Sequence, residues 1–82
     1  MGVDMNQQEL RTKVYKVKRQ VRDTIGTDLS HEFRSTQVYQ AYCGLCGEAQ
    51  VAYEEGELDD QAVTLLEEYA QKVIAVWQGG ST

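Results

Sequence analysis

The stretch NQQELRTKVYKVKRQVRDTI, residues 6–25, carries the clearest structural signal in the chain. Its apolar residues recur at spacings of 4, 3, 4 and 4, at Leu10, Val14, Val17, Val21 and Ile25. This spacing places them along one side of a helix, whereas a half-buried strand would alternate apolar and polar residues. We therefore expect an amphipathic helix over residues 6–25, with Gly26 as its stop.

Two further helical patterns follow. Residues 35–55 place apolar side chains at helical spacing, at Val38, Tyr42, Leu45, Ala49 and Ala52. Residues 60–78 are apolar over at least half of the helix circumference, and Asp59 is suited to cap that helix. We expect this third helix to be the central one. Residues 26–34 should form a connection, with room for one helical turn, whose apolar residues cover one end of the core.

The absence of proline from all 82 residues favours long uninterrupted helices. The short linker 56–59 predicts that the second and third helices form an antiparallel hairpin. Stripes that alternate spacings of 3 and 4 are typical of helices packed at about 20°. The predicted fold is all-α: an up-down-up three-helix bundle with coiled-coil-like packing. It forms one helical domain over residues 1–82, with frayed tails at 1–5 and 79–82.

Charge is unevenly distributed along the chain, whose net charge is −5. Six of the eight basic residues form a patch on the first helix: Arg11, Lys13, Lys16, Lys18, Arg19 and Arg22. Acidic residues dominate from residue 44 onward. We expect a cytoplasmic protein without membrane contact, because residues 1–6 lack the layout of a signal peptide and the longest apolar run, 73–77, is far short of a span of about 20 residues.

The sharpest chemical motif is the CxxC sequence at Cys43 and Cys46. Three chemical interpretations are open: a redox dithiol, half of a zinc site and half of an iron–sulfur site. A zinc site within one chain lacks ligands, since His31 lies 12 residues earlier, so four thiolates would have to come from two chains. The alternative is structural, because a free cysteine also behaves as a small apolar side chain.

The basic first helix has two interpretations. Its cations could contact the phosphates of a nucleic acid in a salt-sensitive manner. They could instead be solvated, or face the acidic residues of the same chain or of a neighbouring subunit. Because the chain as a whole is acidic, we expect the second arrangement and keep nucleic-acid binding as an alternative function.

Small and aromatic residues mark candidate contact surfaces. Gly44, Gly47 and Val51 point away from the apolar stripe of the second helix, where small residues would let a partner helix approach closely; a kink at Gly44 is the alternative. Tyr15 and Tyr39 also lie outside the stripes, and tyrosine is enriched at interfaces. We expect a non-enzymatic helical interaction module without a metal or cofactor, an adaptor or regulator that binds a protein partner or itself as a homo-oligomer. A CxxC redox or metal-binding protein is the main alternative.

Overall fold

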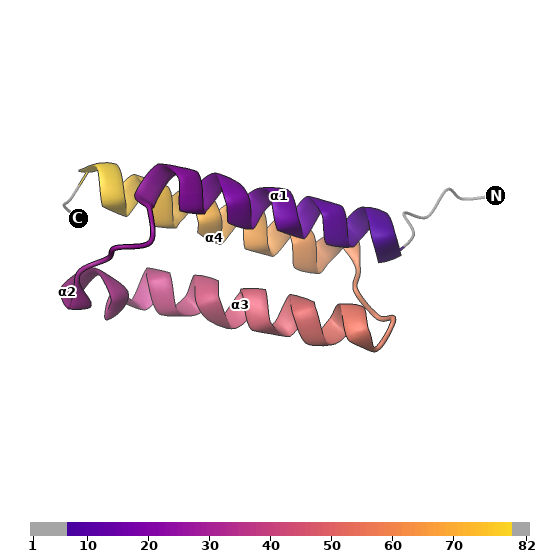
Figure 1. Ribbon diagram of the computed structural model, residues 1–82. Helices are drawn as coiled ribbons and strands as arrows, with labels where there is room; N and C mark the ends of the chain where they lie inside the picture. The colour runs from indigo at the N-terminus through magenta and orange to yellow at the C-terminus, as the bar shows by residue number, and fades with distance from the viewer. Residues whose placement is uncertain (1–6, 80–82) are drawn as a thin grey trace.

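The computed structural model describes residues 7–79, and this part of the chain is helical and contains no strand. The helices are α1 (Gln7–Ile25), α2 (His31–Arg34), α3 (Gln37–Glu54) and α4 (Asp60–Gly79) (Figure 1). The prediction of an all-helical fold is confirmed, with four helices packed together where three were expected. The molecule is elongated, with dimensions of 46 × 19 × 19 Å.

The predicted tails lie mainly outside the described residues. Residues 1–5 and 80–82 lie outside the described residues, so the structure does not test their predicted fraying. Gly79 lies within the described part as the last residue of α4. The helix continues one residue beyond its predicted end at residue 78, a difference that is ordinary at a helix terminus.

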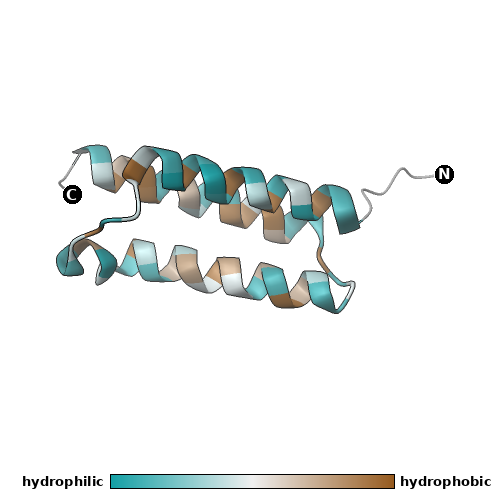
Figure 2. Ribbon diagram, viewed as in Figure 1, coloured by the Kyte–Doolittle hydropathy of each residue, from teal (hydrophilic) through white to brown (hydrophobic). Residues whose placement is uncertain are grey.

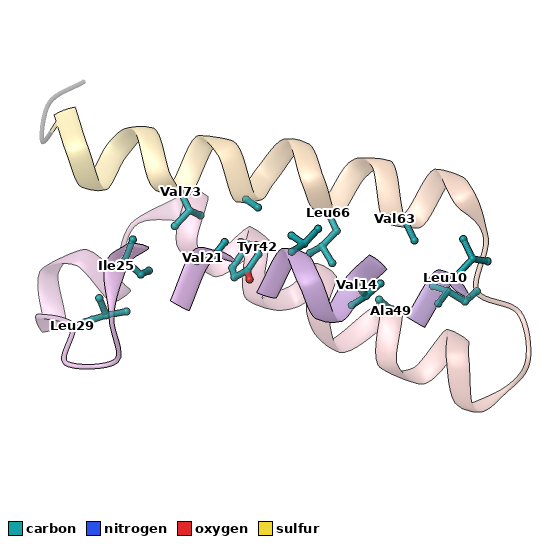
Figure 3. Packing of buried hydrophobic residues seen from close by; sticks show 13 residues of the cluster. Leu10, Val14, Val21, Ile25, Leu29, Tyr42, Ala49, Val63, Leu66 and Val73 are labelled. Carbon is teal, nitrogen blue, oxygen red and sulfur yellow. The ribbon is translucent and has the colours of Figure 1, made fainter. Parts of the chain in front are cut away.

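The core lies between the three long helices (Figure 3). Every member of the predicted stripe of α1 is buried, and the hydrophilic residues of α1 dominate its outward side (Figure 2). The least exposed large side chains are Val63, Leu66 and Val73 on α4, each at 1% or less. Helix α4 packs extensively on both α1 and α3, whereas α1 and α3 contact each other much less. This arrangement agrees with the central position predicted for the most apolar helix.

The connection between α1 and α3 contains the single-turn helix α2. Ser30 caps its start by accepting a hydrogen bond from the Phe33 backbone N–H at 3.1 Å, and Thr36 caps α3 in the same way through the Tyr39 N–H at 3.3 Å. The Phe33 ring meets the edge of Trp77 with ring centroids 5.1 Å apart. Leu29 is buried in the core and Phe33 packs against it, so the apolar residues of the connection cover the core as expected from the sequence.

Glycine has different roles inside and after the helices. Helix α3 continues through Gly44 and Gly47, so neither glycine breaks it. Gly26 and Gly56 follow α1 and α3 with φ values of 77° and 74°, a left-handed conformation that favours glycine. Gly26 therefore ends α1 as predicted, and Gly56 follows α3 in the same conformation. Asp59 accepts the Ala62 N–H at 2.8 Å as the predicted cap of α4.

Candidate interaction groove between α1 and α3

A groove of about 940 Å3 opens between α1 and α3, which contact each other less than either contacts α4. Both helices instead pack on α4, and this leaves space between them toward the end that carries α2. Buried side chains of the core form the apolar part of the lining: Val21, Ile25, Leu29 and Tyr42. The groove is therefore continuous with the hydrophobic core, and an occupant would extend that core.

Four cations lie around the groove. Helix α1 contributes Lys18, Arg19 and Arg22, and α2 contributes Arg34; the acidic residue in the lining is Asp23. Within residues 7–79, none of the four cations forms an ion pair with a carboxylate. The groove thus concentrates positive charge on a protein whose net charge is −5, which suits an anionic occupant.

The predicted basic patch is divided by the helix geometry. Half of its six members line the groove, whereas Arg11, Lys13 and Lys16 do not. The Arg11 guanidinium lies over the Tyr53 ring, 5.0 Å from its centroid, in a cation–π contact between α1 and α3. Six charges within twelve helical positions cannot share one side, because successive residues turn by about 100°.

The CxxC thiols lie on the α3 wall of the groove, three residues apart on a continuous helix. Cys43 is exposed and Cys46 is half-buried, and both are free thiols. Burial raises the pKa of the Cys46 thiol, although the Tyr42 hydroxyl and the charge of Lys18 partly offset this effect. Cys46 is therefore protonated at neutral pH, which opposes a role as an activated nucleophile.

Two tyrosines complete this wall. Tyr42 is 6% exposed, and burial raises the pKa of its hydroxyl well above its usual range. Burial also raises the pKa of Tyr39, whose ring centroid lies 5.5 Å from that of Phe33 and 6.4 Å from that of Tyr42. The sequence placed Tyr39 on an exposed surface. It is instead half-buried, because the turn of α2 brings Phe33 against it.

The predicted contact surface at Gly44, Gly47 and Val51 lies on the outward face of α3. A Cβ atom added to Gly44 or Gly47 would meet no atom within 4 Å, and Val51 is 51% exposed. No other described element covers this face. Tyr15 is 67% exposed on α1 and borders the groove.

The surroundings of the CxxC motif bear on the metal-binding alternative. Within residues 7–79, no group of three or more His, Cys, Asp or Glu side chains is placed to hold a metal ion. Zinc held by four thiolates from two copies stays an alternative that the sequence leaves open.

Sequence reasoning missed two contributors to the groove. Arg34 was treated as part of a connection, although the caps at Ser30 and Thr36 could have indicated a separate helical turn. Tyr42 was recognised as a core residue but not as part of a surface groove. Neither position could be assigned to the groove from periodicity, because the opening depends on how far α1 and α3 stand apart.

Comparisons with known proteins do not assign the chain to a family. No family model, curated protein or solved structure matches the chain. Among the described residues, no helix combines the length and apolar character needed to cross a membrane.

Proposed function

We propose that the protein is a small non-enzymatic module for protein–protein interaction, an adaptor or regulator that associates with itself, and that the α1–α3 groove is its main contact surface. The observation that carries the proposal is the composition of this groove. An apolar floor formed by core residues is bordered by arginine and tyrosine side chains. This combination is typical of interfaces, in which an apolar centre is surrounded by a polar rim and arginine and tyrosine contribute much of the binding energy.

The protonation states in the groove favour binding over catalysis. The pKa values of Tyr39, Tyr42 and Cys46 are all raised by burial, so these groups hold their protons at neutral pH. A tyrosine or cysteine that acts as a general base or a nucleophile at neutral pH would need a lowered pKa instead. The same side chains are well suited to contact a partner through their rings and hydroxyl groups.

We also propose the finer topology expected from the sequence, an up-down-up bundle of the three long helices in which α3 and α4 form an antiparallel hairpin with coiled-coil-like packing. The short connection between α3 and α4 supports this arrangement, as does the packing of α4 on both other long helices. A cytoplasmic location likewise stays a prediction.

Site-specific photo-crosslinking tests the proposed function. A benzophenone amino acid would replace Tyr15 at the groove or, as a matched control, Gln71 on the exposed part of α4. In cells that produce the protein, we expect protease-sensitive adducts from position 15 and few from position 71. Nuclease-sensitive adducts at position 15 would favour the nucleic-acid alternative, and equal labelling at the two positions would contradict a defined contact surface.

The CxxC alternative has a separate test. Purified protein prepared without chelator would be analysed for zinc and iron and then exposed to a mild oxidant. We expect no stoichiometric metal and no intramolecular disulfide between Cys43 and Cys46. Stoichiometric metal, or a disulfide between Cys43 and Cys46, would favour the redox or metal-binding function over the interaction module.

A further inference from the structure

The face of α3 that lines the groove changes character along its length. Tyr39, Cys43, Gly47, Gln50 and Glu54 follow one another at spacings of 4, 4, 3 and 4, so they share one side of the helix. Tyr39 and Cys43 line the groove among its cations. Glu54 lies about 22 Å from Tyr39 along the helix axis, at a rise of 1.5 Å per residue. One side of α3 therefore runs from the groove, whose cations belong to α1 and α2, to an acidic end.

The acidic end extends into the connection between α3 and α4, at the opposite end of the molecule from α2 (Figure 1). Its carboxylates are all exposed and belong to Glu54, Glu55, Glu57, Asp59 and Asp60. Gln50 Nε2 donates to Glu54 Oε2 at 3.1 Å and so helps to orient this carboxylate along the helix surface. The charge of this segment is complementary to that of the groove.

The middle of the same side is open. Gly47 lies between the two ends, and nothing within 4 Å would meet a Cβ atom there. If two copies of α3 cross in opposite directions at Gly47, residues equally distant from position 47 face each other. Gln40 then lies opposite Glu54 of the other copy, and Cys43 lies opposite Val51. A two-fold axis at Gly47 brings the acidic end of each copy toward the groove of the other copy. One symmetric arrangement therefore forms two equivalent contacts between opposite charges.

We propose that the α1–α3 groove is occupied by the acidic end of α3 from a second copy, in an antiparallel dimer centred on Gly47. This inference rests on the proposed function, because it names the occupant of the same groove. Charge complementarity favours a second copy, since the four groove cations lack ion pairs within residues 7–79 and the chain itself presents five exposed carboxylates of opposite charge. A groove of about 940 Å3 accepts several side chains of such a helix end.

Charge-swap complementation tests the dimer. One variant carries Lys18→Glu and Arg22→Glu in the groove, and the other carries Glu54→Lys and Glu55→Lys at the acidic end. Sedimentation equilibrium should show each variant to associate at least about a hundredfold more weakly than the wild type, because like charges then meet at both contacts. An equal mixture should recover a heterodimer, since each altered groove then meets an altered acidic end and each native groove meets a native one.

Two controls separate charge placement from folding. Lys13→Glu with Lys16→Glu makes the same change in charge on α1 outside the groove, and this variant should dimerise like the wild type. Circular dichroism would verify that each variant keeps its helices. Recovery in the mixture also demonstrates folding, because unfolded partners could not complement each other.

Several results would overturn the inference. These are a wild type that is monomeric up to about millimolar concentration, folded variants that fail to complement, or a dimer that a chelator dissociates. A monomer that still gives protein crosslinks at the groove would contradict the second copy as occupant but leave the interaction module intact. A monomer without such crosslinks would contradict both proposals.

Discussion

The side chain of Gln7 pairs with the backbone of Leu58 in both directions, although the two residues are 51 positions apart. Gln7 Nε2 donates to the Leu58 carbonyl oxygen at 2.7 Å, and the Leu58 N–H donates to Gln7 Oε1 at 3.0 Å. The amide thus satisfies both backbone polar groups of Leu58, a buried residue outside the helices. It joins the start of α1 to the connection between α3 and α4, which carries the acidic end of the molecule.

The two hydrogen bonds predict that Gln7 contributes to the stability of the fold. Gln7→Ala leaves both Leu58 backbone groups without their partner, so we expect the free energy of unfolding to fall by about 1–2 kcal/mol. Gln8→Ala is the matched control, because the Gln8 side chain is exposed and should contribute little. Urea unfolding would measure both variants. Equal effects of the two substitutions would contradict the structural role of the Gln7 amide.

Adjacent leucines of α4 should respond very differently to truncation. Leu66 is fully buried at 0% exposure, whereas Leu65 is 42% exposed. We expect Leu66→Ala to lower the free energy of unfolding by about 3 kcal/mol, since it removes buried apolar contacts and leaves a cavity. Leu65→Ala should change it by only about 0.5 kcal/mol. Denaturant midpoints that rank the two variants in the opposite order would contradict the register of α4.

Glycine replacements separate folding from association. Gly47→Ala fills open space within a continuous helix, so we expect a gain in stability of about 1 kcal/mol. Gly56→Ala forces an L-residue into a left-handed conformation and should lower stability by about 1 kcal/mol. If two copies cross at Gly47, the added methyl group also weakens association. A Gly47→Ala protein that is less stable as a monomer would contradict the open surface.

Alkaline pH should destabilise the fold. The folded-state pKa of Tyr42 is raised by burial, so the unfolded chain releases this proton first, near its ordinary pKa of about 10. Stability is therefore retained below this pH and falls as the pH rises above it, by up to about 1.4 kcal/mol per pH unit for one group. The raised pKa values of Cys46 and Tyr39 act in the same direction.

Tyr42→Phe tests this linkage directly. The variant should lose stability less steeply than the wild type when urea midpoints are compared between about pH 9 and 11, because the titrating group is gone. The comparison concerns the slope with pH, so a loss of stability common to all pH values does not affect it. An identical slope in both proteins would show that Tyr42 ionises freely in the folded state.

The two thiols should react at different rates. Cys43 is exposed, whereas burial shields Cys46 and raises its pKa. Because the thiolate is the reactive form, we expect an alkylating reagent at neutral pH to modify Cys43 about tenfold faster or more. Peptide mapping by mass spectrometry would assign the products. Faster modification of Cys46 would point to an activated thiol and favour the redox alternative.

The helices were predictable because their signals are local. All five apolar stripe residues of α1, from Leu10 to Ile25, are buried as predicted. The stripe of α3 is also evident in the sequence, yet of its five residues only Tyr42 and Ala49 are buried. The difference has a tertiary cause, because α3 packs mainly on α4 and leaves its side toward α1 partly open.

The groove was not predictable from the same pattern. Its width depends on the separation of α1 and α3, and its fourth cation depends on how the turn of α2 places Arg34. Periodicity shows which side of a helix is apolar but not how closely two helices approach. The basic residues of α1 were correctly singled out, whereas their division between the groove and the Arg11–Tyr53 contact required the fold.

Native mass spectrometry of the purified protein tests most directly whether it associates through this surface. At low ionic strength we predict a species of twice the 9.3 kDa chain mass without bound metal, and a single-chain species for the Lys18→Glu, Arg22→Glu variant. A wild-type protein that stays a single chain at every concentration would contradict self-association. A double-chain species that persists in the variant or contains zinc would contradict the groove as its basis.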